Sequence, residues 1–141
     1  MLIYATEASA RHITPVGHPE RFDRVAAVER GLAGIPATRR ESPLAEEADI
    51  LRCHPARYLT RIRAAEPASG TAQLDPDTWM SPGSYEAASR AVGGACAAVD
   101  AVLNGDDTTA FVIARPPGHH AEPDAAMGFC IYTLTKQPAG I

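Results

Sequence analysis

The sequence predicts an α/β fold, in which helices pack against a parallel β-sheet. Two short apolar runs, residues 2–5 and 109–114, have the length of strands, and helical patterns fill most of the chain between them. This alternation of strand, helices and strand is typical of a parallel sheet whose strands are connected by helices. The 141 residues suit a single domain. The second apolar run, "TAFVIA", is continuous, so we expect a strand buried on both faces.

The first strand, "LIYA", is followed by polar residues that end it, and the next helices carry their own signals. Residues 18–34 have Pro19 where a first helical turn tolerates proline and end on glycines, which predicts a helix. Residues 42–65 contain Pro55, which disfavours a helical conformation at His54. This segment therefore predicts two short helices, one on each side of His54.

The longest helix is predicted at about residues 82–103. Ser81 is a suitable N-cap, and Asn104 and Gly105 are typical of a helix end. Small alanine and glycine side chains at residues 91–98 indicate close packing against a sheet. The residues before this helix, 74–81, are predicted to form a turn-rich loop.

Composition excludes several classes of function. The net charge of -4 provides no broad cationic surface, so direct binding of nucleic acid is not expected. The first ten residues lack a signal-peptide pattern, and no stretch reaches the roughly 18 apolar residues that span a bilayer. We therefore expect no membrane partner and a cytoplasmic location. Cys53, Cys96 and Cys130 are widely spaced, which predicts reduced thiols rather than disulfides or a zinc finger.

The segment that follows the second strand, residues 114–130, is the best candidate for a functional site. Pro116 and Pro117 fix the backbone, and Gly118 permits conformations that other residues avoid. His119 and His120 follow directly, so the two imidazoles stand on a stiff base. Ligand sites in parallel sheets gather beyond the carboxyl ends of the strands, which is where this loop is predicted.

Paired imidazoles are suited to proton transfer because histidine titrates nearest to neutral pH. His119 and His120 could serve as base and acid in a hydrolytic cycle if carboxylates fix their tautomers. Adjacent histidines are expected to point apart, whereas a catalytic zinc needs about three converging ligands. The pattern alone leaves another interpretation open, in which both histidines bond to neighbouring carbonyl groups and Glu122 and Asp124 are solvated.

Three segments resemble one family of enzymes. "RPPGHHAEPDAAMGFC" resembles the histidine-pair motif of the zinc-dependent histone deacetylase family, in the form of class II-like bacterial members and acetylpolyamine amidohydrolases. "GHPERFDRV" and "LDPDTWMSPGSYEAA" resemble two further segments of that family, in the same order. The resemblance implies a partial, truncated arginase/deacetylase-like three-layer fold. Residues 1–132 would be the N-terminal part of the domain, and residues 133–141 a divergent or truncated tail.

The resemblance also implies catalytic roles. His120 corresponds to the general base and acid, and His119 to a histidine with an electrostatic role beside the metal-bound water. Cys130 supports a weaker alternative, a thiol hydrolase that uses a histidine of the loop; it requires a lowered thiol pKa and an oxyanion hole.

For substrate binding, the resemblance assigns Gly128 and Phe129 to the wall of a narrow channel that takes an acetylated lysine or an acetylpolyamine. Asp77 corresponds to an aspartate at the rim of that channel. Arg24 corresponds to an arginine in an inner cavity near the acetate exit. Phe22 stands where the family usually has proline, which is a departure from the family's motif close to Arg24.

Intact members of the family use zinc, and their zinc ligands and oxyanion-stabilising tyrosine lie beyond the position of Tyr132. Here the chain reads "TLTKQPAGI" instead. We therefore expect a histone deacetylase-like amidohydrolase by ancestry that, as this chain, binds no catalytic zinc and is inactive. The alternative is a noncatalytic remnant or interaction module. An open sheet edge would favour self-association.

Overall fold

The computed structural model describes residues 1–134, and its centre is a three-stranded parallel sheet. The strands are β1 (Leu2–Ala5), β2 (Thr38–Glu41) and β5 (Ala110–Val112), in the order β2-β1-β5. Leu2 lies opposite Thr38 on one side and Ala110 on the other. The predicted parallel α/β sheet is therefore confirmed. β2 was not predicted, because all four of its residues are exposed and give no apolar pattern.

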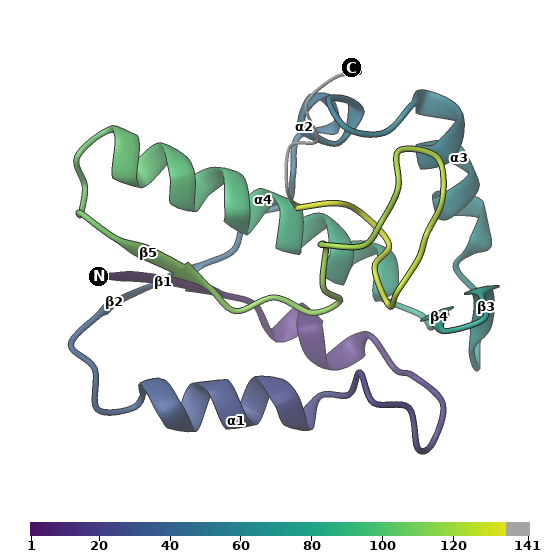
Figure 1. The fold of residues 1–141 in the computed structure, drawn as a ribbon, viewed down its shortest axis with the longest axis horizontal. Helices are drawn as coiled ribbons and strands as arrows, with labels where there is room; N and C mark the ends of the chain where they lie inside the picture. The colour runs from purple at the N-terminus through teal and green to yellow at the C-terminus, as the bar shows by residue number, and fades with distance from the viewer. Residues whose placement is uncertain (135–141) are drawn as a thin grey trace.

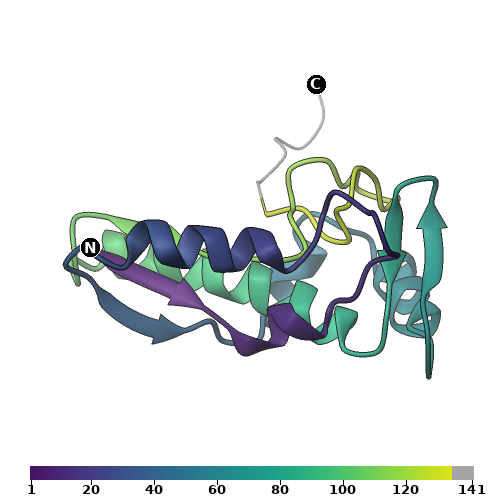
Figure 2. The ribbon, with the colours of Figure 1, turned by 90° about the horizontal axis from the view of Figure 1, so that it is seen from below.

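Helices cover both faces of this sheet and produce three layers. Helix α1 (Asp23–Leu32) packs on one face, where Val25 contacts Ile3 and Ile113. Helix α4 (Ser84–Leu103) lies along the other face, where its alanines pack against Leu2 and Tyr4. Figure 1 shows the sheet between the two helices, and the rotated view in Figure 2 shows α1 running alongside the strands.

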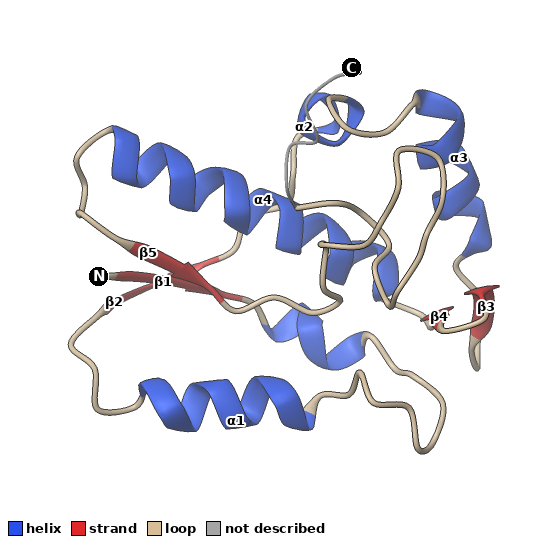
Figure 3. Cartoon of the chain, in the orientation of Figure 1, coloured by secondary structure: helices blue, strands red, loops and turns tan. Residues whose placement is uncertain are grey.

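The remaining elements pack together at one end of α4, beside the three layers. They are the 3-10 helix η1 (Glu7–Arg11), the helices α2 (Glu47–Leu51) and α3 (Ala56–Ala65), and the antiparallel strands β3 (Ala72–Asp75) and β4 (Thr78–Met80). The largest apolar cluster joins α2, α3 and α4 to residues 131 and 132. The two predicted short helices around His54 are confirmed, whereas the hairpin β3–β4 replaces part of the predicted loop (Figure 3).

Three details of the predicted elements are wrong. Helix α4 begins at Ser84 after Gly83, whose φ of 90° lies in the left-handed region, and Ser81 is not its N-cap. Helix α1 begins at Asp23, so Pro19 lies before the helix rather than in its first turn. Strand β5 is not buried on both faces: Phe111 is 42% exposed, because β5 pairs only with β1 within residues 1–134. Self-association through that edge stays a prediction.

The small residues of α4 do allow close packing, and the nearest partner is the chain that follows β2. A β-carbon on Gly93 would overlap the carbonyl oxygen of Pro43 and lie 2.7 Å from the nitrogen of Ala45. A β-carbon on Gly94 would lie 2.5 Å from the Ser42 hydroxyl oxygen.

Although α4 is 20 residues long, none of the helices within residues 1–134 is both long and apolar enough to cross a membrane.

Candidate active site

The two histidines lie in an irregular segment that begins where β5 ends. Residues 113–134 form neither a helix nor a named strand and pass beside α3 and the β3–β4 hairpin (Figures 1 and 3). His119 and His120 are both exposed, and each lies in a bend. Their ring centroids are 4.2 Å apart. The expectation that adjacent histidines point apart is therefore wrong here, because the bends bring both rings to the same side.

Residues at the C-terminal end of the same loop contact His120 and support it. Its backbone N–H donates to the Cys130 sulfur at 3.4 Å, and the Cys130 thiol donates to the Gly128 carbonyl at 3.3 Å. Gly128 has a φ of 55°, and a β-carbon there would lie 2.7 Å from the His120 β-carbon and 2.8 Å from its ring. Glycine at this position therefore gives the imidazole of His120 its space.

Gly128→Ala is expected to displace the His120 ring, because a methyl group cannot share this space. Gly70→Ala is the matched control: Gly70 has a φ of 69°, but its β-carbon would meet no atom within 4 Å. Both variants strain the backbone by about 1 to 3 kcal/mol. Only Gly128→Ala should shift the NMR signals of the His120 ring, and equal shifts in both variants would contradict the proposed contact.

Phe129 and Asp77, two of the residues assigned to the substrate channel, are brought together by a third group. Phe129 has a φ of 72°, an uncommon conformation for a bulky residue, and its N–H donates to the Thr78 hydroxyl at 3.1 Å. The His18 ring meets the Phe129 ring edge-on with centroids 4.9 Å apart. His18 Nε2 also donates to the carbonyl oxygen of Asp77 at 3.0 Å. The Asp77 side chain itself is exposed.

Arg24 lies near His119 on the other side of the loop. Its guanidinium donates to the Ala114 carbonyl at 2.9 Å and to the Glu20 carboxylate at 3.3 Å. Arg24 and His119 both line a cavity of about 210 Å³ together with Pro117 and Gly118. The side chain of Arg24 is thus partly engaged in holding the start of the loop, which was not predicted.

A buried ionic network beneath the loop was not predicted. Arg115, the residue before Pro116, is 1% exposed and donates from Nε to Glu20 at 2.8 Å. It also donates to the backbone carbonyls of Ser9 and His12. Burial lowers the pKa of Arg115, and the charge of Glu20 opposes that shift. Because charged residues normally lie at the surface, the burial of this pair could not be predicted from the sequence.

His12 belongs to the same network and is held neutral. Its Nδ1 lies 2.7 Å from the Ser84 hydroxyl, and its Nε2 lies 3.6 Å from Glu20. Burial, assisted by the charge of Arg115, lowers the pKa of His12 from 6.5 to about 3. The ring is 1% exposed, so this Ser-His-Glu arrangement is closed to substrate.

The pKa of His12 predicts loss of stability in acid. The unfolded chain protonates His12 below pH 6.5, but the folded chain does so only near pH 3, so stability falls as the pH drops between these values. From pH 6.5 to 4.5 the loss from this group is about 2 to 3 kcal/mol. Urea unfolding at both pH values should show a smaller loss in His12→Gln than in the wild type. An identical loss would contradict this assignment.

Neither imidazole of the histidine pair has a carboxylate partner within residues 1–134. Asp124 is instead bound by Arg57 of α3, whose Nη2 lies 2.7 Å from its carboxylate, and by Arg61. The interpretation in which Asp124 is simply solvated is therefore wrong. These ion pairs fasten the loop to α3.

The residues that are present do not fit a catalytic zinc. Within residues 1–134, no three His, Cys, Asp or Glu side chains come together as ligands, and residues 135–141 contain none of these four types. A hydrolytic zinc needs about three protein ligands. Among the described residues, the histidine pair is therefore not accompanied by a cluster of three such ligands.

The chemistry of Cys130 does not favour a thiol hydrolase. All three cysteines carry free thiols, as predicted, and Cys130 is 0% exposed. Burial raises the pKa of the Cys130 thiol, whereas a nucleophilic cysteine needs a lowered one. The thiol instead bridges the two arms of the loop.

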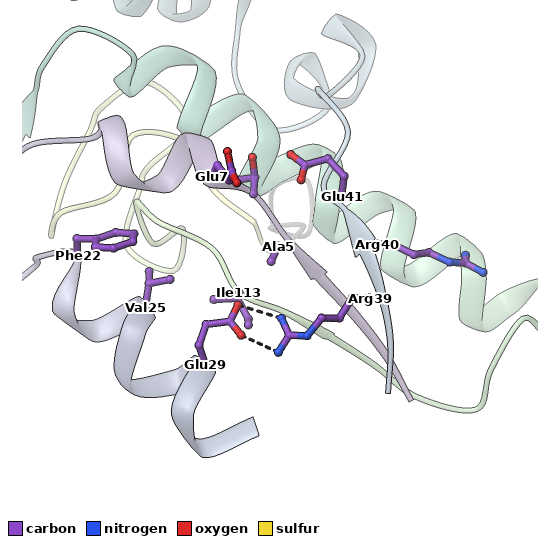
Figure 4. Close-up of a pocket in the computed structure, with 10 residues that line it drawn as sticks. Ala5, Glu7, Phe22, Val25, Glu29, Arg39, Arg40, Glu41 and Ile113 are labelled. Atoms are coloured by element: carbon purple, nitrogen blue, oxygen red, sulfur yellow. Dashed lines mark hydrogen bonds and ion pairs between the residues drawn. The ribbon is translucent and has the colours of Figure 1, made fainter. Parts of the chain in front are cut away.

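A larger hollow lies away from the histidines, between α1 and β2. It has a volume of about 370 Å³, and Phe22, Val25 and Ile113 contribute apolar surface to it. Glu29 and Arg39 form a two-point ion pair across it, as Figure 4 shows, with a shortest N–O distance of 2.6 Å. Because this ion pair spans the hollow and none of the assigned site residues lines it, the histidine loop remains the candidate site.

The fold and the loop define an α/β protein with paired histidines beyond the carboxyl edge of a parallel sheet, where ligand sites in such folds occur. Comparison with known proteins agrees: the sequence profile of the histone deacetylase domain matches residues 18–134. The chain belongs to the histone deacetylase family.

Individual relatives support this assignment. The histone deacetylase-like amidohydrolase of Pseudomonas aeruginosa is 50% identical over 93 residues, which cover 66% of this chain and 24% of that protein. A probable deacetylase of Methanothermobacter thermautotrophicus is 35% identical over 118 residues, which cover 82% of this chain and 35% of that protein. The crystal structure of the HDA15 HD domain shows the same fold, with a TM-score of 0.87 at 23% identity; the match covers 95% of this chain and 41% of that chain. The chain thus spans less than half the length of each of these proteins.

Proposed function

We propose that the histidine loop is the proton-transfer part of an amide hydrolysis site for an acetylated lysine side chain or an acetylpolyamine. The observation that carries this proposal is the pair of exposed imidazoles, 4.2 Å apart, at the carboxyl edge of the sheet. In this role His120 accepts a proton from the attacking water and returns it to the leaving amine. His119, at ring-contact distance, stabilises the charge that develops beside it.

We propose that the neighbouring residues form the substrate channel. Phe129 presents an aromatic face that suits the methylene stem of an acylated lysine or amine. Asp77 lies at the exposed turn between β3 and β4, and His18 links this turn to Phe129. We propose that Asp77 contacts the substrate at the entrance, and that Arg24 serves the acetate end of the site through the cavity it shares with His119.

The proposal includes an expected absence of activity. Zinc would be the family's Lewis acid, but residues 1–141 supply no ligand set for it, so we propose that this chain alone does not hydrolyse amides. The experiment measures the zinc content of the 141-residue chain after dialysis against added zinc, and acetate release from an acetyl-lysine peptide. We expect far less than one zinc per chain and no release. Stoichiometric zinc with turnover that depends on His120 would overturn this part of the proposal.

A further inference from the structure

His54 is a buried residue that contacts both arms of the histidine loop. It lies between α2 and α3, far from His119 in sequence, and is 2% exposed. Its Nδ1 donates to the carbonyl oxygen of Pro123 at 2.9 Å, and its Nε2 accepts from the N–H of Thr133 at 2.9 Å. Both ring nitrogens are therefore engaged by loop backbone, and the two bonds fix the neutral tautomer protonated on Nδ1.

The surroundings of His54 make this contact rigid. Its ring stacks on Tyr58 with centroids 4.8 Å apart, and the Tyr58 hydroxyl donates to the carbonyl oxygen of Ile131 at 2.5 Å. The ring of Tyr132 lies on another side, with centroids 5.4 Å apart. The two bonded positions, Pro123 and Thr133, enclose the segment that carries Gly128 and Cys130, which in turn supports His120.

We infer that His54 is a positioning residue that sets the geometry of the histidine pair by holding Pro123 and Thr133 at a fixed separation. Two opposed hydrogen bonds from one planar ring define a distance and an orientation, which apolar packing alone does not. The catalytic meaning of this inference rests on the proposed function. The contact itself does not, so it is tested without measuring activity.

The test compares four variants of the 141-residue chain by amide hydrogen exchange and by NMR of the histidine rings. His54→Leu keeps bulk but loses both bonds, and His54→Gln keeps a donor and an acceptor at similar reach. His54→Asn is one methylene shorter, so its amide cannot bond to Pro123 and Thr133 at the same time. Val25→Ala is the control, because it weakens a separate apolar cluster with Ile3 and Ile113.

We expect His54→Leu to speed exchange of the Thr133 amide about tenfold or more relative to amides of α4, and to shift the ring signals of His119 and His120. Val25→Ala should speed exchange in all regions together. His54→Gln should resemble the wild type, and His54→Asn should resemble His54→Leu.

Two results would overturn the inference. In one, loop amides in His54→Leu accelerate only in step with α4, and the rings of His119 and His120 do not shift. In the other, His54→Gln and His54→Asn behave alike, which would mean that ring packing matters and the two hydrogen bonds do not. If His54→Leu does not fold, the comparison of glutamine with asparagine decides the question alone.

Discussion

His120→Ala is expected to lower the rate of acetate release by about 10²- to 10⁴-fold in a chimaera that completes the domain. The chimaera joins residues 1–134 to the downstream part of the Pseudomonas aeruginosa amidohydrolase, of which this chain matches 24%. The reason is that no other group among the described residues is placed to replace the imidazole. Its neighbour His119 is in ring contact but occupies a different position.

Two controls accompany the His120→Ala substitution. Zinc should remain bound in His120→Ala, because the imidazole is not proposed as a ligand, so metal content separates lost proton transfer from a lost metal. Cys130→Ala removes the buried thiol that supports the loop. We expect it to retain most of the turnover. A loss as large as that of His120→Ala would revive the thiol hydrolase alternative.

Glu20→Ala is expected to destabilise the 141-residue chain by about 3 to 5 kcal/mol, because it leaves the buried guanidinium of Arg115 without its counter-ion. Glu20 is 3% exposed and accepts from Arg115 at 2.8 Å and from Arg24 at 3.3 Å. A domain of this size is usually stable by only about 5 to 15 kcal/mol. The substitution should therefore move the urea midpoint strongly or prevent folding.

Glu29→Ala is the matched control for Glu20→Ala. Glu29 also pairs with an arginine, Arg39, and the shortest N–O distance is 2.6 Å, but both side chains are substantially exposed. Water already screens such a pair, so its loss is expected to leave the free energy of unfolding close to that of the wild type. Equal destabilisation by the two variants would contradict the account of the buried network.

The parts of the fold that could be predicted from the sequence are those with a local signal. The apolar run of β1, the proline between α2 and α3, and the long alanine-rich pattern of α4 each identify an element. Strand β2 carries no such signal, since "TRRE" owes its conformation to hydrogen bonds with β1. The exposure of Phe111 follows from the position of β5 at a sheet edge, which depends on which strands are its neighbours.

The residues of the candidate site also differ in whether a local sequence signal predicts them. His119 and His120 are visible because their loop is locally unusual, with two prolines and a glycine before them. The groups that hold the loop are distant in sequence: Glu20 and Arg115 are 95 positions apart, and His54 and Thr133 are 79 apart. In the sequence each of these residues looks like an ordinary polar residue, because its burial arises only in the folded chain. Long-range polar contacts of this kind leave no periodic pattern.

We propose that this chain carries the proton-transfer half of a deacetylase site and lacks the metal half. Acetate release by the chimaera, measured with zinc content on the same preparation, tests it most directly. For the chimaera we expect about one zinc per chain and acetate release from an acetyl-lysine peptide or an acetylpolyamine, and for the 141-residue chain we expect neither. A folded chimaera that holds zinc but releases no acetate would contradict the claim and favour a noncatalytic remnant.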